Sequence, residues 1–224
     1  GRYGAGAACG GVVKKRRNLI ILIVLLIPVL IGIGLVFFDK SVSFSIGPVS
    51  TGKKIGLVKV EDIILSSDEY VHQIRDMAKD NTVTALILRI DSPGGAVAPS
   101  QEIFGEVLRF RETGKPIVVS MGNVCASGGY YIASAGDRLF ANPGSITGSI
   151  GVRFELLQYY KLMDKLGIDI DVLKAGKYKD MGSPHRDLTQ EERRLLQGVI
   201  DDTHEQFIED VAYAREMDID SLRM

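Results

Sequence analysis

The chain has no tryptophan, only two cysteines and three histidines among its 224 residues, and its formal net charge is −1. Two cysteines are too few for a disulfide-stabilised scaffold, and the lack of excess positive charge excludes a basic nucleic-acid-binding protein. Hydrophobic residues make up 46% of the chain, which is too apolar for a disordered protein. The composition leaves a folded protein, for which we expect no nucleic-acid partner.

Acidic residues are also missing from the first 17 positions, although these carry five basic residues: Arg2, Lys14, Lys15, Arg16 and Arg17. The rest of the chain holds 22 basic and 28 acidic residues. The small net charge is therefore the sum of a basic head and an acidic body. Between them lies an apolar run over residues 19–38, in which only Pro28, Gly32 and Gly34 are not strongly apolar.

As a helix this run would measure about 30 Å, which matches the hydrocarbon thickness of a bilayer. The positive-inside rule then predicts a basic cytoplasmic tail (residues 1–18), a transmembrane helix (19–38) and an extracytoplasmic remainder. A cleaved signal peptide is the alternative, but its apolar region normally has only about 7–15 residues. We therefore expect a single-pass anchor in the cell membrane, in contact with lipid. Cys9 and Cys125 would lie on opposite sides of it and could not pair.

Residues 39–53 have the composition of a linker, and residues 54–224 alternate between strand and helix patterns. Strands are predicted at residues 55–60, 85–90, 116–121, 138–141 and 170–173. Helices are predicted after Ser67, at residues 100–111 and 128–135, around residues 156–163, and after a capping box formed by Thr189 and Glu192. This order predicts an α/β domain with a mainly parallel sheet covered on both faces. We expect the C-terminus to be truncated, because the chain ends soon after the last helix.

Three glycine-rich turns are candidates for chemistry. In residues 91–95, two glycines after a proline allow an unusual φ and leave N–H groups free for an anion. An ordinary strand-to-helix turn is the alternative, and the motif taken alone favours it, because Pro-Gly turns are common. In residues 126–129, Ser127 stands between a strand and a helix, as a nucleophile does, with the Gly128 N–H as an oxyanion donor. A helix-cap serine is the alternative there. Residues 144–151 are rich in hydroxyls and poor in charge, so we expect a partly buried loop.

A serine nucleophile needs a base, and the sequence leaves its identity open. His72, His185 and His204 carry no mark of a Ser-His-Asp triad, which is nonetheless not excluded. Lys177 and Lys179 lie together in a short loop after a predicted strand. A lysine acts as a base only when desolvation favours its neutral form, and a solvated basic turn is the alternative.

Five blocks in this order and spacing resemble the signal peptide peptidase A (protease IV) family of membrane-anchored Ser-Lys peptidases, in its short single-domain form. The blocks are Asp91-Ser92-Pro93-Gly94-Gly95, Ala126-Ser127-Gly128-Gly129-Tyr130-Tyr131, Ala141-Asn142-Pro143, Thr147-Gly148-Ser149-Ile150-Gly151-Val152 and Gly176-Lys177-Tyr178-Lys179-Asp180. The resemblance extends from about Lys54 to Met224. It implies a crotonase/Clp-protease-like α/β domain behind one N-terminal transmembrane helix.

The resemblance also implies roles for individual residues, without a metal or a cofactor. Ser127 matches the nucleophile of the family, and Lys179 matches its general base. Ser149 matches the residue whose hydroxyl holds the lysine ammonium in place. The amides of Gly95 and Gly128 match the oxyanion hole, and Gly94 shapes its turn.

The expected function is that of a serine endopeptidase that degrades signal-peptide remnants or other membrane-associated peptides through an acyl-enzyme. Hydrophobic or small-residue segments would be its substrates. Family members form ring-shaped homo-oligomers in which neighbouring subunits complete the site. Three alternatives remain at this point: a stomatin-partner-type membrane serine protease, a crotonase-fold acyl-CoA enzyme, and an inactive membrane scaffold.

Overall fold

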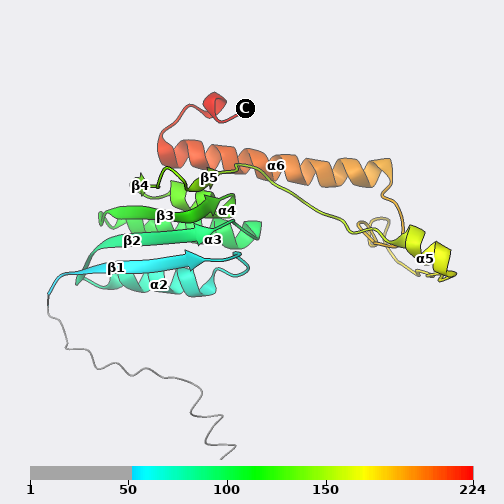
Figure 1. Ribbon diagram of the computed structural model, residues 1–224, viewed down its shortest axis with the longest axis horizontal. Coiled ribbons are helices and arrows are strands. Elements are labelled where there is room, and N and C mark those ends of the chain that lie inside the picture. Colours follow the sequence, from blue (N-terminus) through cyan, green and yellow to red (C-terminus); the bar gives the residue numbers. More distant parts are fainter. Residues whose placement is uncertain (1–51, 224) are drawn as a thin grey trace, which may run out of the picture. The chain divides into compact units, whose positions relative to one another are not determined.

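A computed structural model describes residues 52–223 (Figure 1). The expected cytoplasmic tail, the transmembrane helix and most of the linker lie outside the described residues. Within residues 52–223, no helix combines the length and the apolarity needed to cross a bilayer.

Five parallel strands form one sheet, which confirms the predicted mainly parallel α/β fold. They are β1 (Lys54–Glu61), β2 (Val83–Ser92), β3 (Ile117–Ala126), β4 (Arg138–Phe140) and β5 (Ile146–Gly148). The order is β1-β2-β3-β4, and β5 pairs with the last three residues of β3. The third strand is therefore longer than predicted and ends directly before Ser127.

Helices alternate with the strands as far as β4, as the sequence predicts, whereas β5 follows β4 without a helix between them. They are α2 (Asp68–Lys79), α3 (Val97–Glu112), α4 (Gly128–Ser134), α5 (Tyr160–Leu166), α6 (Gln190–Arg215) and the 3-10 helix η1 (Ile219–Ser221). The predicted capping box is confirmed at the start of α6. The Glu192 N–H donates to Thr189 Oγ at 3.1 Å, and the Thr189 N–H donates to Glu192 Oε2 at 2.9 Å.

The hydrophobic core lies between one face of the sheet and the helices. Alternate residues of the strands supply the sheet side: Val58, Val60, Leu86, Leu88, Ile90, Ile117, Val119 and Met121. The helices supply Ile74, Ile103, Phe104, Val107, Phe110, Ile132, Phe207 and Val211. The core thus holds α3, α4 and the second half of α6 in place around the carboxyl end of the sheet.

The opposite face of the sheet is not covered by any described residue, so the prediction of a sheet covered on both faces is wrong for this part of the chain. Ile55 and Leu57 are 63% and 50% exposed, and Ala85 and Ile87 are only half-buried. Successive side chains of a strand point to opposite faces. A continuous apolar run therefore does not by itself reveal whether both faces have a partner layer.

One further prediction is wrong in the segment between β4 and α6. Residues 170–173 form no strand, since no neighbouring strand pairs with them, and Leu173 is 94% exposed. The glycine-rich loop of residues 144–151 is partly buried, as predicted: Ser145, Gly148 and Ile150 are half-buried, and Ile150 packs against the core, whereas Ile146 in β5 is 64% exposed. Helix α5 begins only at Tyr160 and has no buried residue.

The one-sided sheet predicts unequal effects of two leucine substitutions. Leu88→Ala should lower the free energy of unfolding by about 2–5 kcal/mol, because Leu88 is fully buried. Leu57→Ala, on the open face of the neighbouring strand, should cost less than about 1 kcal/mol. Urea denaturation of both variants measures the difference. Equal losses would mean that the open face is covered in the full protein.

Candidate functional site

The carboxyl ends of the parallel strands bring the three glycine-rich turns together. Gly94 and Gly95 follow β2, Ser127 follows β3, and Ser149 follows β5. The Ser127 N–H donates to the Gly148 carbonyl at 2.9 Å, which joins the second turn to the third. Ligands in open α/β sheets bind at this end of the strands. The predicted residues from these turns therefore share one site.

Ser127 has a strained backbone with φ 51° and ψ −124°. A residue other than glycine in such a conformation costs about 1–3 kcal/mol, and the conformation is typical of a nucleophile at a strand-to-helix turn. Ser127 stands at the N-cap position of α4, yet its side chain makes no capping hydrogen bond. The hydroxyl of this half-buried serine has no recorded partner within residues 52–223, so it does not serve as a helix cap.

The first turn packs directly against Ser127, at a distance that only glycine permits. Gly94 has φ 99°, and a Cβ there would lie 2.6 Å from the Gly128 nitrogen and 2.9 Å from the Ser127 Cβ. A Cβ on Gly128 would lie 3.4 Å from the Gly95 nitrogen. The Gly128 N–H, in the first turn of α4, has no intrahelical acceptor. The amides of Gly95 and Gly128 thus border the same space beside the serine hydroxyl.

A cleft of about 620 Å³ opens at this point. It is lined by Pro93, Gly94, Gly95, Val97, Ser100, Gln101, Ser127, Gly128, Tyr131, Ser149, Gly151, Val152, Arg153, Thr203 and Phe207. Every site residue expected from the three turns lines it. The walls from α3, α4 and α6 were not predicted, because apolar side chains at helical spacing are typical of a core and carry no sign of a cleft.

Tyr131 forms the best-fixed wall of the cleft. Its ring lies 4.6 Å from that of Phe104 and 4.8 Å from that of Phe207, measured between centroids. Its hydroxyl donates to the Asp210 carboxylate, and burial, followed by that carboxylate, raises the pKa of Tyr131. Tyr131 therefore remains a neutral phenol that shapes the cleft.

Cys125 is excluded as a nucleophile. The residue is buried and unpaired, and its thiol donates to the Gly129 carbonyl at 3.6 Å. Burial, with a smaller effect of Asp91, raises the pKa of Cys125 to about 12, so the thiol stays protonated. Among residues 52–223, no group of three or more His, Cys, Asp or Glu side chains is arranged to hold a metal ion.

The two candidate lysines lie in the loop before α6, outside the cleft, and the three histidines lie outside the cleft as well. Lys177 pairs with Glu191 at 2.6 Å, and Glu191 and the Tyr178 hydroxyl raise its pKa, which keeps it charged. The exposed Lys179 ammonium has no recorded hydrogen bond or ion pair within the described part of the chain. Of the two, Lys179 is therefore the one that pairs with no carboxylate of residues 52–223.

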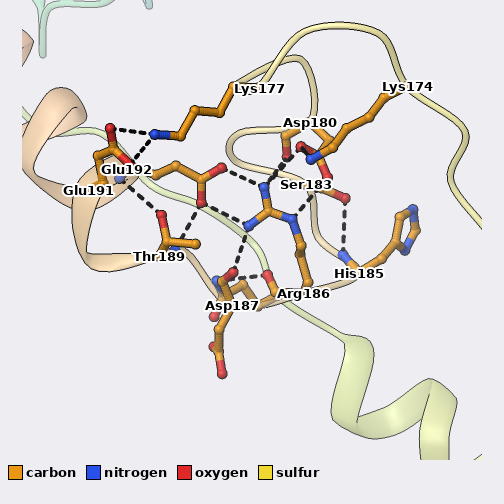
Figure 2. Close-up of polar contacts among 11 residues, drawn as sticks. Lys174, Lys177, Asp180, Ser183, His185, Arg186, Asp187, Thr189, Glu191 and Glu192 are labelled. Atoms are coloured by element: carbon orange, nitrogen blue, oxygen red, sulfur yellow. Dashed lines mark hydrogen bonds and ion pairs between the residues drawn. The ribbon is translucent and has the colours of Figure 1, made fainter.

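Arg186 ties this loop to the first turn of α6 (Figure 2). Its guanidinium donates to the Asp180 carboxylate at 3.0 Å and to the Glu192 carboxylate at 2.8 Å. Lys174 also pairs with Asp180. The pKa of Glu192 is lowered to about 2, mainly by Arg186 and next by the Thr189 N–H. Arg186 and Lys174 hold the pKa of Asp180 well below its usual range. Lys179 is thus anchored through its neighbour Asp180.

The structure does not bring Lys179 to Ser127 within one chain. Its loop is bound to α6 at Glu191 and Glu192, whereas the cleft touches α6 at Thr203 and Phe207. At about 1.5 Å per residue these positions are roughly 17–24 Å apart along the helix axis, several times the reach of a lysine side chain. Figure 1 shows the loop and α5 beside the N-terminal end of α6, away from the sheet.

Comparisons with known proteins point to one enzyme family. The family model described as "Peptidase family S49" matches residues 109–224. A protein of Methanocaldococcus jannaschii named as a protease is 42% identical over 150 residues, which are 67% of this chain and 48% of that protein. A protein of Enterococcus faecium named as a signal peptide peptidase is 31% identical over 209 residues, 87% of this chain and 61% of that protein.

A third relative is named as a chloroplastic serine protease of Arabidopsis thaliana. It is 34% identical over 157 residues, which are 70% of this chain but only 23% of that protein. The chain thus spans about a quarter to three fifths of the length of these curated relatives.

The Arg186 contacts predict a pH-dependent contribution to stability. Folding lowers the pKa of Glu192 from 4.5 to about 2, so the contribution is complete above pH 4.5 and is lost as the pH falls towards 2. Arg186→Gln should therefore lower the urea midpoint at neutral pH. The difference from the wild type should become smaller as the pH falls from 4.5 towards 2. Arg194→Gln, an exposed position of α6 with no recorded ion pair among the described residues, is the matched control. A loss that is the same at every pH would contradict the role given to these contacts.

Proposed function

The chain belongs to peptidase family S49, and from this premise we propose that it carries the catalytic part of a membrane-anchored serine endopeptidase with a Ser–Lys dyad. One observation carries the proposal above all. The Ser127 hydroxyl, free of a capping bond, stands at a strained strand-to-helix turn beside two backbone amides in a 620 Å³ cleft. This is the arrangement that nucleophilic attack on a carbonyl needs.

The proposed reaction is acyl transfer. Neutral Lys179 accepts the proton of the Ser127 hydroxyl while Oγ attacks the peptide carbonyl carbon. The amides of Gly95 and Gly128 donate to the oxygen as it becomes negative, and Lys179 returns the proton to the leaving amine. Lys179 then deprotonates a water molecule, which attacks the ester carbonyl, and it returns that proton to Ser127 Oγ as the bond between Oγ and the acyl carbon breaks.

We infer that Lys179 reaches Ser127 from a neighbouring copy in a ring-shaped homo-oligomer. The separation along α6 supports this, as do the exposed apolar side chains on the segment that carries α5, among them Leu157 at 77% and Leu173 at 94% exposure. A packed neighbour would cover these side chains. It would also remove water from Lys179, which favours the neutral amine, and Ser149 at the cleft would hold the amine in place.

Membrane-associated peptides, including signal-peptide remnants, are the proposed substrates. The expected anchor would hold the peptidase domain at the outer surface of the cell membrane, where such peptides remain. Val97, Tyr131 and Phe207 give the cleft apolar walls that suit small or hydrophobic side chains. The Enterococcus relative, whose name is that of a signal peptide peptidase, supports the same substrate class.

The geometry favours this proposal over an acyl-CoA enzyme or an inactive scaffold. An acyl-CoA enzyme would use the amides of Gly95 and Gly128 but would not need a serine at position 127. An inactive scaffold would need neither the amides nor the serine. A strained serine whose side chain makes no capping bond has a cost in stability, and the nucleophile role accounts for that cost. A stomatin-partner-type protease would use the same dyad and differs in its expected substrate.

Substitution of either dyad residue should abolish hydrolysis of a fluorogenic peptide that carries the apolar segment of a signal sequence. Ser127→Ala and Lys179→Ala should each lower kcat by about 10⁴-fold or more, since members of a catalytic unit fail together. Lys79→Ala, at an exposed lysine in the last turn of α2, should keep the rate of the wild type. Turnover that persists in either dyad variant would overturn the assignment.

A mixing experiment tests where the base comes from. Co-assembled Ser127→Ala and Lys179→Ala chains should recover about a quarter of the wild-type activity, because a random ring then contains that share of sites with both residues intact. Each variant alone should stay inactive. No recovery in verified mixed rings would mean that each chain supplies both residues of its own site.

A further inference from the structure

We propose that Ser92 is a positioning residue, whose buried hydroxyl holds the Gly94–Gly95 turn at the distance from Ser127 that oxyanion stabilisation requires. This inference rests on the proposed function. Ser92 is the last residue of β2 and is fully buried, and burial of a polar side chain has a cost in free energy. Its hydroxyl therefore calls for an explanation.

The Ser92 hydroxyl connects the turn to the chain segment that follows β1. Its Oγ accepts the buried Gly94 N–H at 3.1 Å and donates to the Asp62 carbonyl. Asp62 has φ 59°, a conformation that residues other than glycine rarely adopt. After Asp62 the chain runs beside the Gly94–Gly95 turn. One side chain thus joins two loops that lie 30 residues apart in the sequence.

Residues 62–64 complete this clamp through backbone contacts. The Ile64 N–H donates to the Gly94 carbonyl at 3.0 Å, and the Ala96 N–H donates to the Ile64 carbonyl at 2.8 Å. A Cβ on Gly95 would lie only 2.1 Å from that carbonyl oxygen, so the two segments are in close contact. Both polar groups of Gly94 are therefore held, whereas no partner is recorded for the Gly95 N–H within residues 52–223.

Ser92 also supports the segment that follows the nucleophile. A Cβ on Gly129 would lie 2.9 Å from the Ser92 carbonyl oxygen and 3.5 Å from the Ser92 Cβ. The first turn of α4, which carries the Gly128 amide, therefore packs on Ser92. Ser92 thus sets the position of both proposed amide donors. Loss of its hydroxyl would leave the buried Gly94 N–H without a partner.

Kinetics with a matched control test this role. Ser92→Ala should lower kcat about 10–100-fold with KM within about twofold, because a displaced donor costs somewhat less than one that is removed. The affinity for a peptide boronate, which mimics the tetrahedral intermediate, should fall by the same factor. Ser134→Ala removes an equally buried hydroxyl, bonded to the Tyr131 carbonyl in α4, and should change neither quantity.

Amide hydrogen exchange tests the clamp without relying on activity. In Ser92→Ala the Gly94 and Ile64 amides should exchange at least about tenfold faster, while the core amide of Leu88 keeps its rate. Ser134→Ala should leave Gly94 unchanged. Should Ser92→Ala not fold, Ser92→Cys fills the space with a weaker donor and acceptor and is measured in the same way.

The outcomes separate the two proposals. A wild-type chain without any hydrolysis would refute the proposed function, and the exchange result would then decide alone whether Ser92 holds the turn. With an active wild type, an unchanged kcat or an unchanged Gly94 exchange rate in Ser92→Ala would overturn the role of Ser92.

Discussion

The parallel pairing of β3 with its neighbours on both sides is the constraint on which the rest of the site depends. Parallel strands end at the same edge of the sheet, so the turns after β2, β3 and β5 meet although they are far apart in sequence. The Ser127 N–H bond to the Gly148 carbonyl extends the β3–β5 ladder by one residue into the turn. The serine is therefore held by the sheet itself and not by a flexible loop.

Close backbone contact is the second requirement of this site, and glycine is how the chain meets it. Gly94 approaches the Ser127 turn within a distance that admits no Cβ, and Gly95 approaches Ile64 in the same way. Such contacts leave little room for motion, and they allow the strained φ of Ser127 to persist. Rigid positioning of donors before the reaction is what makes backbone amides effective in stabilising an oxyanion.

The proposed base and the proposed nucleophile are held by different sets of contacts. Ser127 stands at the edge of the packed sheet, whereas Lys179 lies in a loop fixed to α6 by Arg186 and its two carboxylates (Figure 2). Each part is ordered by its own interactions, and the two are separated along α6. If a neighbouring chain supplies Lys179, as we propose, hydrolysis would be restricted to the oligomer.

Local patterns in the sequence were enough to predict the parallel α/β fold, the capping box of Thr189 and Glu192, and the glycine-rich turns with Ser127. These features depend on residues close together in the chain, whose backbone preferences and hydrogen bonds are encoded locally. Within residues 52–223, tertiary structure alone decided that one sheet face is open, that residues 170–173 are not a strand, that Tyr131 and Phe207 form cleft walls, and that Lys179 is remote from Ser127. Each of these depends on which distant elements pack together, and an apolar or basic residue looks the same in sequence whichever neighbour it meets.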